Sequence, residues 1–225
     1  MAHARFSELK MTSINILFHS VTGHTFKLAE AIGEGVSSLP GCQANLKRIP
    51  EPAGLEPIGM PVDTENIIRF DHLAEAKVED LVDCDGLALG TPVYWGNMTY
   101  ATKYFLDSVA NLRQVPSPQG PVAAVQALIG KPVTVFTGGG GGLANDFAIS
   151  GIWTTLSFFG MTIVTVGMRV PEVSDTSHLG GGSPLGAGSY SRSPGERPSG
   201  NELAIARAQG RALAEVTQAW SQRTL

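Results

Sequence analysis

Three short segments of the chain combine glycine with small polar or aromatic residues, and each directly follows an apolar run. They are HSVTGHT at residues 19–25, TPVYWGNMT at residues 91–99 and TGGGGG at residues 137–142. Hydroxyls and backbone N–H groups can bind phosphate, aromatic rings can stack on a planar ligand, and glycine backbone can approach a ligand closely. These segments are the candidate ligand-binding loops of the chain.

The first segment runs into a helical pattern that starts near Phe26. The N–H groups of a helix N-terminus, the positive end of the helix dipole and the hydroxyls of Ser20, Thr22 and Thr25 would form a phosphate cradle without Lys or Arg. The alternative is a capped helix start, in which a Ser or Thr hydroxyl only accepts a backbone N–H bond.

The other two segments offer surfaces for a flat ligand. Tyr94 and Trp95 follow Pro92 at a predicted loop tip, where they could stack on a planar ring or equally be core or interface residues. The five glycines from Gly138 to Gly142 lie between a predicted buried strand and a predicted buried helix, which disfavours a flexible linker. We expect them to bring backbone N–H and C=O groups against a ligand.

Several competing motifs are absent from the sequence. Lys131 precedes the glycines, so no P-loop occurs, and Leu143 stands where a GxGxxG motif would close. GxSxG and HExxH do not occur either. Cys42 and Cys84 are far apart, which suits a reducing cytoplasm and gives no zinc site. The histidines have no metal-ligand spacing, and all but His24 are predicted to be structural or solvated: His3, His19, His24, His72 and His178.

Composition indicates one globular domain. The 225 residues are 43% hydrophobic and 16% charged, enough to bury a substantial core. The net charge is −4 and the 16 basic residues are scattered, so nucleic acid is not an expected partner. No signal peptide is expected at the start of the chain. Residues 147–168 carry no charge, but their polar residues and Gly160 indicate a buried helix followed by a buried strand rather than a membrane span.

Strands and helices alternate along the sequence. Apolar, β-branched runs predict five strands at Ile14–Phe18, Ala44–Ile49, Gly86–Gly90, Pro132–Phe136 and Met161–Val166. Helical patterns are found at Phe26–Val36, Leu73–Val82, Ala101–Val109, Ala144–Phe159 and Glu202–Trp220. Short, almost wholly apolar strands between helices indicate a parallel sheet covered on both faces. We therefore expect an α/β, flavodoxin-like doubly wound fold with a five-stranded parallel sheet in the order 2-1-3-4-5.

The expected organisation is a polar N-terminal extension at 1–12 and a single domain at 13–225. This domain would carry an insertion at about 50–72 and a long loop at about 167–200, both rich in Pro or Gly. In an open α/β sheet, ligands bind outside the carboxyl ends of the strands. The three candidate segments directly follow strands, so the fold would bring them to one edge.

Taken together, these segments resemble the WrbA (tryptophan-repressor-binding-protein) family of flavodoxin-like NAD(P)H:quinone oxidoreductases. The resemblance runs from about Ile14 to Gly210 and includes FLD at 105–107 and WTTL at 153–156. Its most specific part is the tail, GGSPLGAGSYS followed by ELAIARAQG. The resemblance implies FMN as cofactor, NADH or NADPH as hydride donor, a small-molecule quinone as acceptor, and a homotetramer.

The resemblance also implies roles for particular residues. The FMN phosphate would be held by Ser20, Val21, Thr22, Gly23, His24 and Thr25. The flavin ring would lie between Pro92, Val93, Tyr94, Trp95 and Asn97 on one side and Thr137, Gly138, Gly139, Gly140, Gly141 and Gly142 on the other. The substrate would meet Thr22, Trp95, Arg113 and Phe158. No catalytic side chain and no metal are implied, because the flavin carries the chemistry.

The chain departs from the family pattern in its glycine run, where bare backbone replaces hydroxyl donors, in a longer insertion from Arg113 to Val125, and at three single positions. Thr22 replaces a Tyr linked to the nicotinamide cofactor, Phe158 replaces a His near the flavin, and Arg113 replaces a Trp at the substrate cleft. If the resemblance holds, loss of the His would remove a proton donor near the reduced quinone and would favour a more hydrophobic acceptor. The alternative function is an FMN-binding electron-transfer or multimeric interaction protein without NAD(P)H oxidase activity. An FMN-free scaffold is disfavoured, because it leaves the three segments unexplained.

Overall fold

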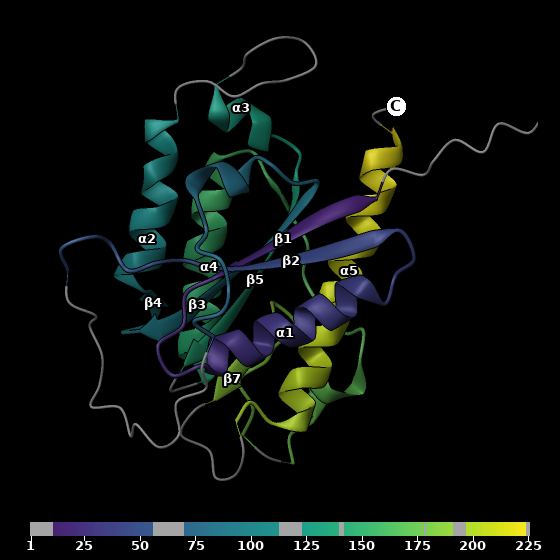
Figure 1. The fold of residues 1–225 in the computed structure, drawn as a ribbon. Helices are drawn as coiled ribbons and strands as arrows, with labels where there is room; N and C mark the ends of the chain where they lie inside the picture. The colour runs from purple at the N-terminus through teal and green to yellow at the C-terminus, as the bar shows by residue number, and fades with distance from the viewer. Residues whose placement is uncertain are drawn as a thin grey trace, which may run out of the picture.

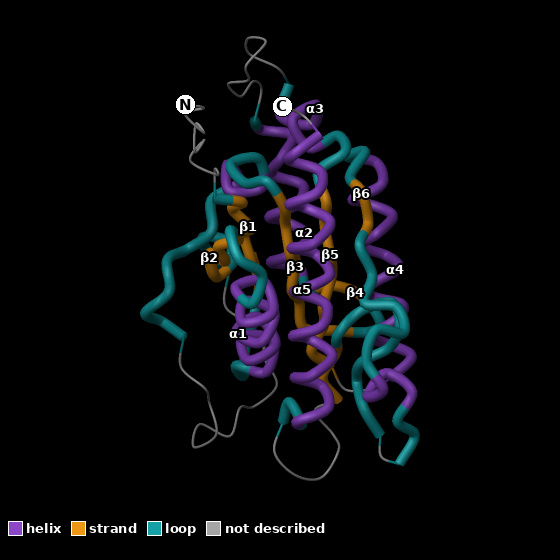
Figure 2. Tube along the Cα trace, turned by 90° about the vertical axis from the view of Figure 1, so that its right-hand side faces the viewer, coloured by secondary structure: helices purple, strands orange, loops and turns teal. Residues whose placement is uncertain are grey.

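The computed structural model of the chain describes residues 11–55, 70–112, 123–139, 142–177, 179–190 and 197–223. A largely parallel sheet runs through the middle of the molecule, and helices cover both of its faces (Figures 1 and 2). The predicted α/β, flavodoxin-like class is confirmed.

Five strands form the parallel core of the sheet in the order β2-β1-β3-β5-β6, which confirms the predicted order. Their bounds are Thr12–Phe18 (β1), Cys42–Arg48 (β2), Gly86–Tyr94 (β3), Pro132–Gly139 (β5) and Thr162–Ile163 (β6). Two further strands were not predicted: Asn97–Met98 (β4), antiparallel to β3, and Gly188–Tyr190 (β7), parallel to β5.

The helices lie in two layers. α1 (His24–Ser37) and α5 (Gly200–Arg223) cover one face, and α2 (Tyr100–Asp107) and α4 (Gly142–Phe158) cover the other. The remaining helix, α3 (Ala124–Leu128), is short, and single 3₁₀ turns occur at Val78–Leu81 (η2), Ser108–Asn111 (η3) and Pro171–Ser174 (η4).

The first strand shows how the apolar pattern builds the two cores. Ile14, Ile16 and Phe18 pack into the cluster under α1 and α5, whereas Leu17 packs into the cluster under α2 and α4. Because side chains alternate between the faces of a strand, a strand that is covered on both faces is apolar almost throughout.

Close contact between α1 and α5 depends on two glycines. A Cβ on Gly35 would lie 2.0 Å from the Arg207 carbonyl oxygen, and one on Gly210 would lie 2.1 Å from that of Ile32. No side chain fits at such distances, so the two helices meet backbone to backbone.

The helix predicted at Leu73–Val82 is wrong. The structure has only the 3₁₀ turn η2 there, and the preceding residues extend along the end of β2. Arg48 N–H donates to the Ala74 carbonyl at 3.0 Å, and Ala76 N–H donates to the Arg48 carbonyl at 2.7 Å. Pairing with the open edge of β2 satisfies the backbone groups that a helix would have used.

The third strand extends beyond its predicted end at Gly90 to Tyr94 and includes Pro92. Proline lacks an N–H and is tolerated in a strand mainly where no neighbour needs that donor. β1 pairs with β3 only as far as Gly90, so Pro92 lies beyond β1 and pairs with Gly138 of β5 alone. Of the two residues predicted at the loop tip, Tyr94 is therefore the last residue of β3, and Trp95 lies in the turn that follows it.

The segment predicted as a long loop at about 167–200 contributes to the sheet. β6 pairs with the start of β5 at Pro132 and Val133, and β7 pairs with its end at residues 137–139. Two short strands thus share one position at the sheet edge, and the predicted strand Met161–Val166 is reduced to two residues. The connection between them contains η4.

Residues 1–10 of the predicted extension and 56–69 of the predicted insertion lie outside the described residues. The uncharged stretch 147–168 contains most of α4 and then β6, so the predicted order of a helix and a strand is confirmed. The prediction that both are buried is wrong, because one side of α4 is exposed and β6 has Thr162 exposed and Ile163 half-buried. Among the helices of the described ranges, none has both the length and the apolar character that crossing a membrane requires.

Candidate functional site

The three candidate segments meet at the carboxyl ends of β1, β3 and β5. A Cβ built on Gly138 would lie 2.8 Å from Thr25 Oγ1, and one built on Gly139 would lie 2.7 Å from Val93 Cβ. The end of β5 therefore touches both the start of α1 and the end of β3. The structure brings together the segments that the sequence singled out.

The first segment leaves the start of α1 open to an anion. Gly23 is the N-cap residue with φ +92°, no side chain caps the helix, and its first turn carries no acidic residue. Ser20 Oγ accepts a hydrogen bond from Gly23 N–H at 3.1 Å, which stabilises the loop rather than the helix end. The uncapped N–H groups and the helix dipole can hold a phosphate here.

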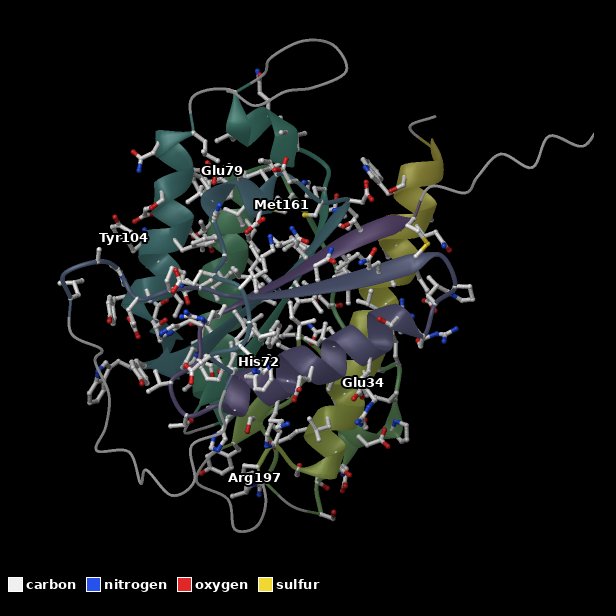
Figure 3. All side chains as sticks on the ribbon, viewed as in Figure 1. Glu34, His72, Glu79, Tyr104, Met161 and Arg197 are labelled. Carbon is white, nitrogen blue, oxygen red and sulfur yellow. The ribbon has the colours of Figure 1, made fainter. Side chains whose placement is uncertain are left out.

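His24 lies at this helix end beside two charged residues that the sequence analysis missed. Its pKa is lowered from the usual value mainly by burial; Glu202 opposes this shift and Arg197 adds to it. Arg197 lies near the N-terminal end of α1, whereas Glu34 lies toward the other end of that helix (Figure 3). The Arg197 side chain is only 8% exposed and its Nη1 lies 3.5 Å from Glu202 Oε2.

Glu202 holds the tail segment in place. Its Oε1 accepts hydrogen bonds from the N–H groups of Gly181 (2.9 Å) and Tyr190 (2.7 Å), and its Oε2 accepts one from Ser199 N–H at 2.7 Å. Ser199 and Glu202 form the S-x-x-E spacing of a capping box at the start of α5. The S-x-x-E spacing is therefore the feature of the sequence from which the role of Glu202 could have been predicted.

The second segment is a tight hairpin. Tyr94 of β3 pairs with Asn97 of β4, and the turn between them, Trp95 and Gly96, has φ values of +56° and +76°. Positive φ at both turn positions is typical of a type I′ turn. The Trp95 side chain is fully exposed and therefore not part of the core of the chain. Behind it, Pro92 and Val93 are buried and Asn97 is exposed.

The third segment begins within β5. Gly138 and Gly139 are its last residues and are buried, Gly142 begins α4, and Gly140 and Gly141 lie outside the described residues. Besides Val93, a Cβ on Gly139 would meet Asn145 Oδ1 at 2.7 Å. Small size is thus required at Gly138 and Gly139, where β5 passes between its neighbours, so these two residues are not part of a linker.

Two buried hydroxyls at this strand end lack a partner. Within the described parts of the chain, neither Thr137 Oγ1 nor Ser189 Oγ has a hydrogen-bond acceptor or donor in reach, although both residues are fully buried. Ser189 of β7 pairs with Gly138 of β5. Buried polar groups without partners are uncommon, and those found often lie where a ligand or an ordered water binds.

A buried hydrogen-bond network forms the wall beside the first segment. His19 Nδ1 lies 2.9 Å from Thr99 Oγ1, and His19 Nε2 lies 2.9 Å from Glu51 Oε1. The Tyr100 hydroxyl donates to the other Glu51 oxygen. Burial lowers the pKa of His19, while the hydrogen bond and charge of Glu51 oppose that shift. The predicted structural role of His19 agrees with this position.

The same carboxylate influences the hairpin. The pKa of Tyr94 is raised first by burial and then by the charge of Glu51. Glu51 thus connects the exit of β2 with the first and second segments, although it is distant from both in sequence.

The family of the chain follows from a comparison of its sequence with known families. A family model described as a flavodoxin-like fold matches residues 21–176, which is more than half of the chain. The chain belongs to the flavodoxin-like fold family. The match begins within the first candidate segment, and it includes the second and the third.

Solved structures agree with this family. A flavodoxin, WrbA-like protein from Agrobacterium tumefaciens is 19% identical, with a TM-score of 0.57, and the match covers 92% of this chain and 98% of that one. A flavodoxin from the domain Archaea is 16% identical (TM-score 0.56, coverage 92% and 99%). Flavodoxin 2 from Bacillus cereus is 16% identical (TM-score 0.52, coverage 91% and 99%). Because all three identities are below 25%, the similarity to these structures supports a shared fold alone.

The predicted substrate residues are not all brought together in this flavodoxin-like chain. Thr22 and Trp95 lie in the first and second segments. Phe158 is the last residue of α4 and 85% exposed, and it lies roughly 24 Å along that helix from Gly142, at about 1.5 Å per residue. Within one chain Phe158 is therefore remote from the three segments. Arg113 lies outside the described residues.

One side of α4 is exposed and uncharged. Its residues recur at helical spacing, and we call them the α4 stripe: Leu143, Phe147, Ser150, Thr154 and Phe158. Leu143 and Phe147 are 75% and 67% exposed. The prediction of a fully buried helix is wrong on this side. Exposed apolar residues grouped in this way are typical of a contact with another molecule.

Proposed function

We propose that this chain is an FMN-dependent NAD(P)H:quinone oxidoreductase of the WrbA type. The observation that carries the proposal is the meeting of an uncapped helix N-terminus with a glycine-lined strand end and an exposed Trp at one edge of the sheet. A ligand that spans this edge needs a phosphate at one end and a flat ring at the other. FMN has both.

The phosphate would lie at the start of α1. The candidate residues there are Ser20, Val21, Thr22, Gly23, His24 and Thr25. The N–H groups of the first turn and the Thr22 and Thr25 hydroxyls supply donors, and Arg197 adds a positive charge nearby. This cation was not part of the sequence-based prediction, which described a cradle without Lys or Arg.

The ring would lie between the hairpin and the glycine run. One wall is made by Pro92, Val93, Tyr94, Trp95 and Asn97, and the other by Thr137 with Gly138, Gly139, Gly140, Gly141 and Gly142. The unpartnered hydroxyls of Thr137 and Ser189 border the glycine wall. When bound, FMN would supply two-electron transfer between NADH or NADPH and a quinone. The side chains then bind and orient, and no nucleophilic side chain is required.

A homotetramer is part of the proposal. The exposed α4 stripe is uncharged and carries Leu143, Phe147 and Phe158, so it offers a partly apolar face for a neighbouring subunit. Phe158 could reach a substrate only in a site of another subunit, because it is remote from the three segments of its own chain. A Phe there makes the substrate cleft more apolar than a His would, which favours a hydrophobic quinone. Both cysteines are free, which suits a cytoplasmic protein.

An absorption spectrum tests the proposal most directly. The purified protein is incubated with FMN and desalted, and its visible spectrum is followed while NADH or NADPH and then benzoquinone are added. Flavin bands that bleach with the nucleotide and return with the quinone are expected. Flavin bands that neither nucleotide changes would favour an FMN-binding electron-transfer or interaction protein, and no FMN uptake would refute the cofactor.

A further inference from the structure

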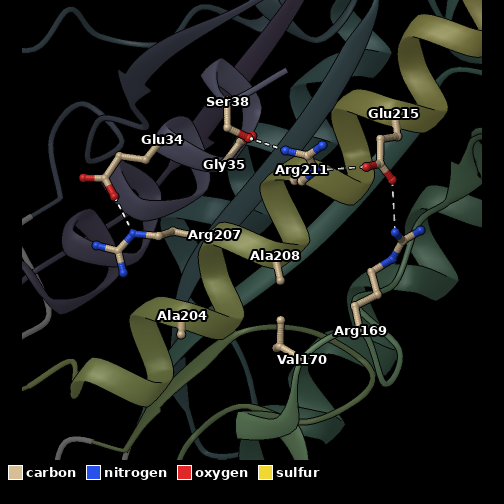
Figure 4. A pocket seen from close by; sticks show the side chains of 10 residues that line it. All are labelled: Glu34, Gly35, Ser38, Arg169, Val170, Ala204, Arg207, Ala208, Arg211 and Glu215. Atoms are coloured by element: carbon tan, nitrogen blue, oxygen red, sulfur yellow. Dashed lines mark hydrogen bonds and ion pairs between the residues drawn. The ribbon is translucent and has the colours of Figure 1, made fainter. Parts of the chain in front are cut away.

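A groove of about 500 Å³ lies between α1, α5 and the segment that precedes η4 (Figure 4). It reaches α1 at Glu34, which follows the first residue of that helix by ten positions. At about 1.5 Å per residue, this places the groove roughly 15 Å along the helix from His24. The groove is therefore separate from the candidate FMN site.

The floor of the groove is small and apolar. Gly35 of α1, Ala204 and Ala208 of α5, and Val170 from the segment before η4 line it. Gly35 lies against the Arg207 carbonyl, so the spacing of the two helices is fixed by backbone contact. A rigid, shallow apolar floor suits a flat ring system rather than a flexible chain.

The rim of the groove has three guanidinium groups but only two carboxylates. Arg207 Nε donates to Glu34 Oε2 at 2.6 Å, Arg169 Nη1 donates to Glu215 Oε2 at 3.0 Å, and Arg211 Nε donates to Glu215 Oε1 at 3.1 Å. The five groups together carry one net positive charge. Arginines stand on opposite sides of the apolar floor, because Arg207 comes from α5 and Arg169 from the segment across from it (Figure 4).

Much of the donor capacity at this rim is unused. A guanidinium has five N–H donors, and these ion pairs occupy only the Nε of Arg207 and one Nη of Arg169. Within the described ranges, the two Nη groups of Arg207 and Nη2 of Arg169 have no acceptor in hydrogen-bond distance. The Arg207 and Arg169 side chains are 49% and 47% exposed, so the existing ion pairs are weak and a ligand can compete with them.

We propose that this groove binds a nucleoside monophosphate. Its phosphate would take the free Nη groups of Arg207 on one side of the floor, since a guanidinium matches phosphate oxygens in pairs. Its base would lie on Val170, Ala204 and Ala208 and extend toward Arg169 on the other side, where a flat ring can stack on the guanidinium plane. The volume lies at the small end of the range for ligand sites, which is about 300 to 1,000 Å³. This inference does not rest on the proposed FMN function.

Calorimetric titration with AMP tests the proposal. The protein is first saturated with FMN, so that AMP cannot report binding at the start of α1. We expect AMP to bind, inorganic phosphate to bind at least tenfold more weakly because it lacks the base, and adenosine to bind more weakly still. Arg207→Gln and Arg169→Gln should each weaken AMP binding by about tenfold, the first through loss of a charged hydrogen bond to the phosphate and the second through loss of the guanidinium that stacks on the base.

Arg48→Gln is the matched control. Arg48 also pairs with a glutamate, at 2.7 Å from Glu75, but lies at the end of β2 outside the groove. It should leave AMP binding unchanged. The proposal is overturned if millimolar AMP gives no heat, if the two groove variants bind AMP like the wild type, or if phosphate binds as tightly as AMP. A protein that takes up no FMN would refute the proposed function, and the two groove variants would then distinguish AMP bound in the groove, which they weaken, from AMP bound at the start of α1, which they do not.

Discussion

A single methyl group at Gly139 should disturb the candidate site more than its size suggests. In Gly139→Ala the new Cβ would lie 2.7 Å from Val93 Cβ. A Cβ atom is fixed to the backbone and cannot rotate away, so β5 and β3 must separate at the end that carries the hairpin. Overpacking of this kind costs about 1–3 kcal/mol, which lowers Tm by roughly 2 to 12 °C in a chain of this size.

The same substitution should weaken FMN binding. Separation of β3 from β5 moves Trp95 relative to the glycine wall, and we expect Kd for FMN to rise at least tenfold, the equivalent of about 1.4 kcal/mol. Fluorescence titration of FMN into the apoprotein measures Kd, and circular dichroism against temperature measures Tm.

Gly33→Ala is the control, since it adds the same methyl group within α1. Its Cβ would lie 3.1 Å from Leu46 Cδ1, the end of a side chain that can rotate, and alanine is favoured over glycine in a helix by about 0.5–1 kcal/mol. Tm should stay constant or rise slightly, and FMN affinity should not change. If Gly139→Ala keeps the wild-type Tm and Kd, or if Gly33→Ala loses as much, the reasoning about the strand end is wrong.

Four further predictions concern the hairpin, the histidines His19 and His24, and the α4 stripe. Trp95→Gly should raise the free energy of unfolding by up to about 1 kcal/mol, because glycine adopts φ +56° without strain. The same substitution should lower FMN affinity about tenfold through lost stacking. An FMN affinity equal to that of the wild type would show that Trp95 does not contact the flavin. Burial lowers the pKa of both His19 and His24, so the unfolded chain binds more protons than the folded one, and stability measured by urea unfolding should fall as pH drops from about 6.5 through the depressed values. NMR titration should also show a still lower pKa for His19 in Glu51→Gln, because the carboxylate opposes the shift. Phe147→Lys should reduce the molar mass measured by light scattering, because it places a charge in the proposed subunit contact. Met168→Lys is the control, since Met168 is equally exposed but lies outside the α4 stripe, and it should leave the molar mass unchanged. An unchanged molar mass in Phe147→Lys would argue against the stripe as the subunit contact.

The strand order could be predicted from the sequence because five apolar runs alternate with helical patterns, and few topologies satisfy that alternation. The failures occur where a tertiary contact overrides the local pattern. Residues 73–76 extend along β2 although their periodicity predicts a helix, and β3 continues through Pro92 because β1 has already ended.

The candidate site was predictable in its loops but not in its supporting wall. The three segments follow strands directly, so the topology alone brings them together. Glu51, in contrast, lies outside all three segments, and nothing in the sequence around it indicates that it bonds His19 and Tyr100. Arg197 also lies outside the segments, and nothing in the sequence indicates its position beside His24. The position of Phe158 follows from the length of α4, which a motif comparison does not consider.

The shared position of β6 and β7 at the edge of the sheet has a consequence for how the molecule opens. Because the chain leaves the sheet after β6 and returns only at β7, the ligand end of β5 and its opposite end are held by separate strands. If β7 detached from residues 137–139 while β6 stayed paired, the glycine wall would loosen, at the cost of the hydrogen bond from Tyr190 N–H to Glu202. Amide protons of β7 should accordingly exchange with solvent before those of β1 and β3, and a bound flavin should slow that exchange. Access to the site would then be governed by three residues at an edge, and the rest of the sheet would remain closed.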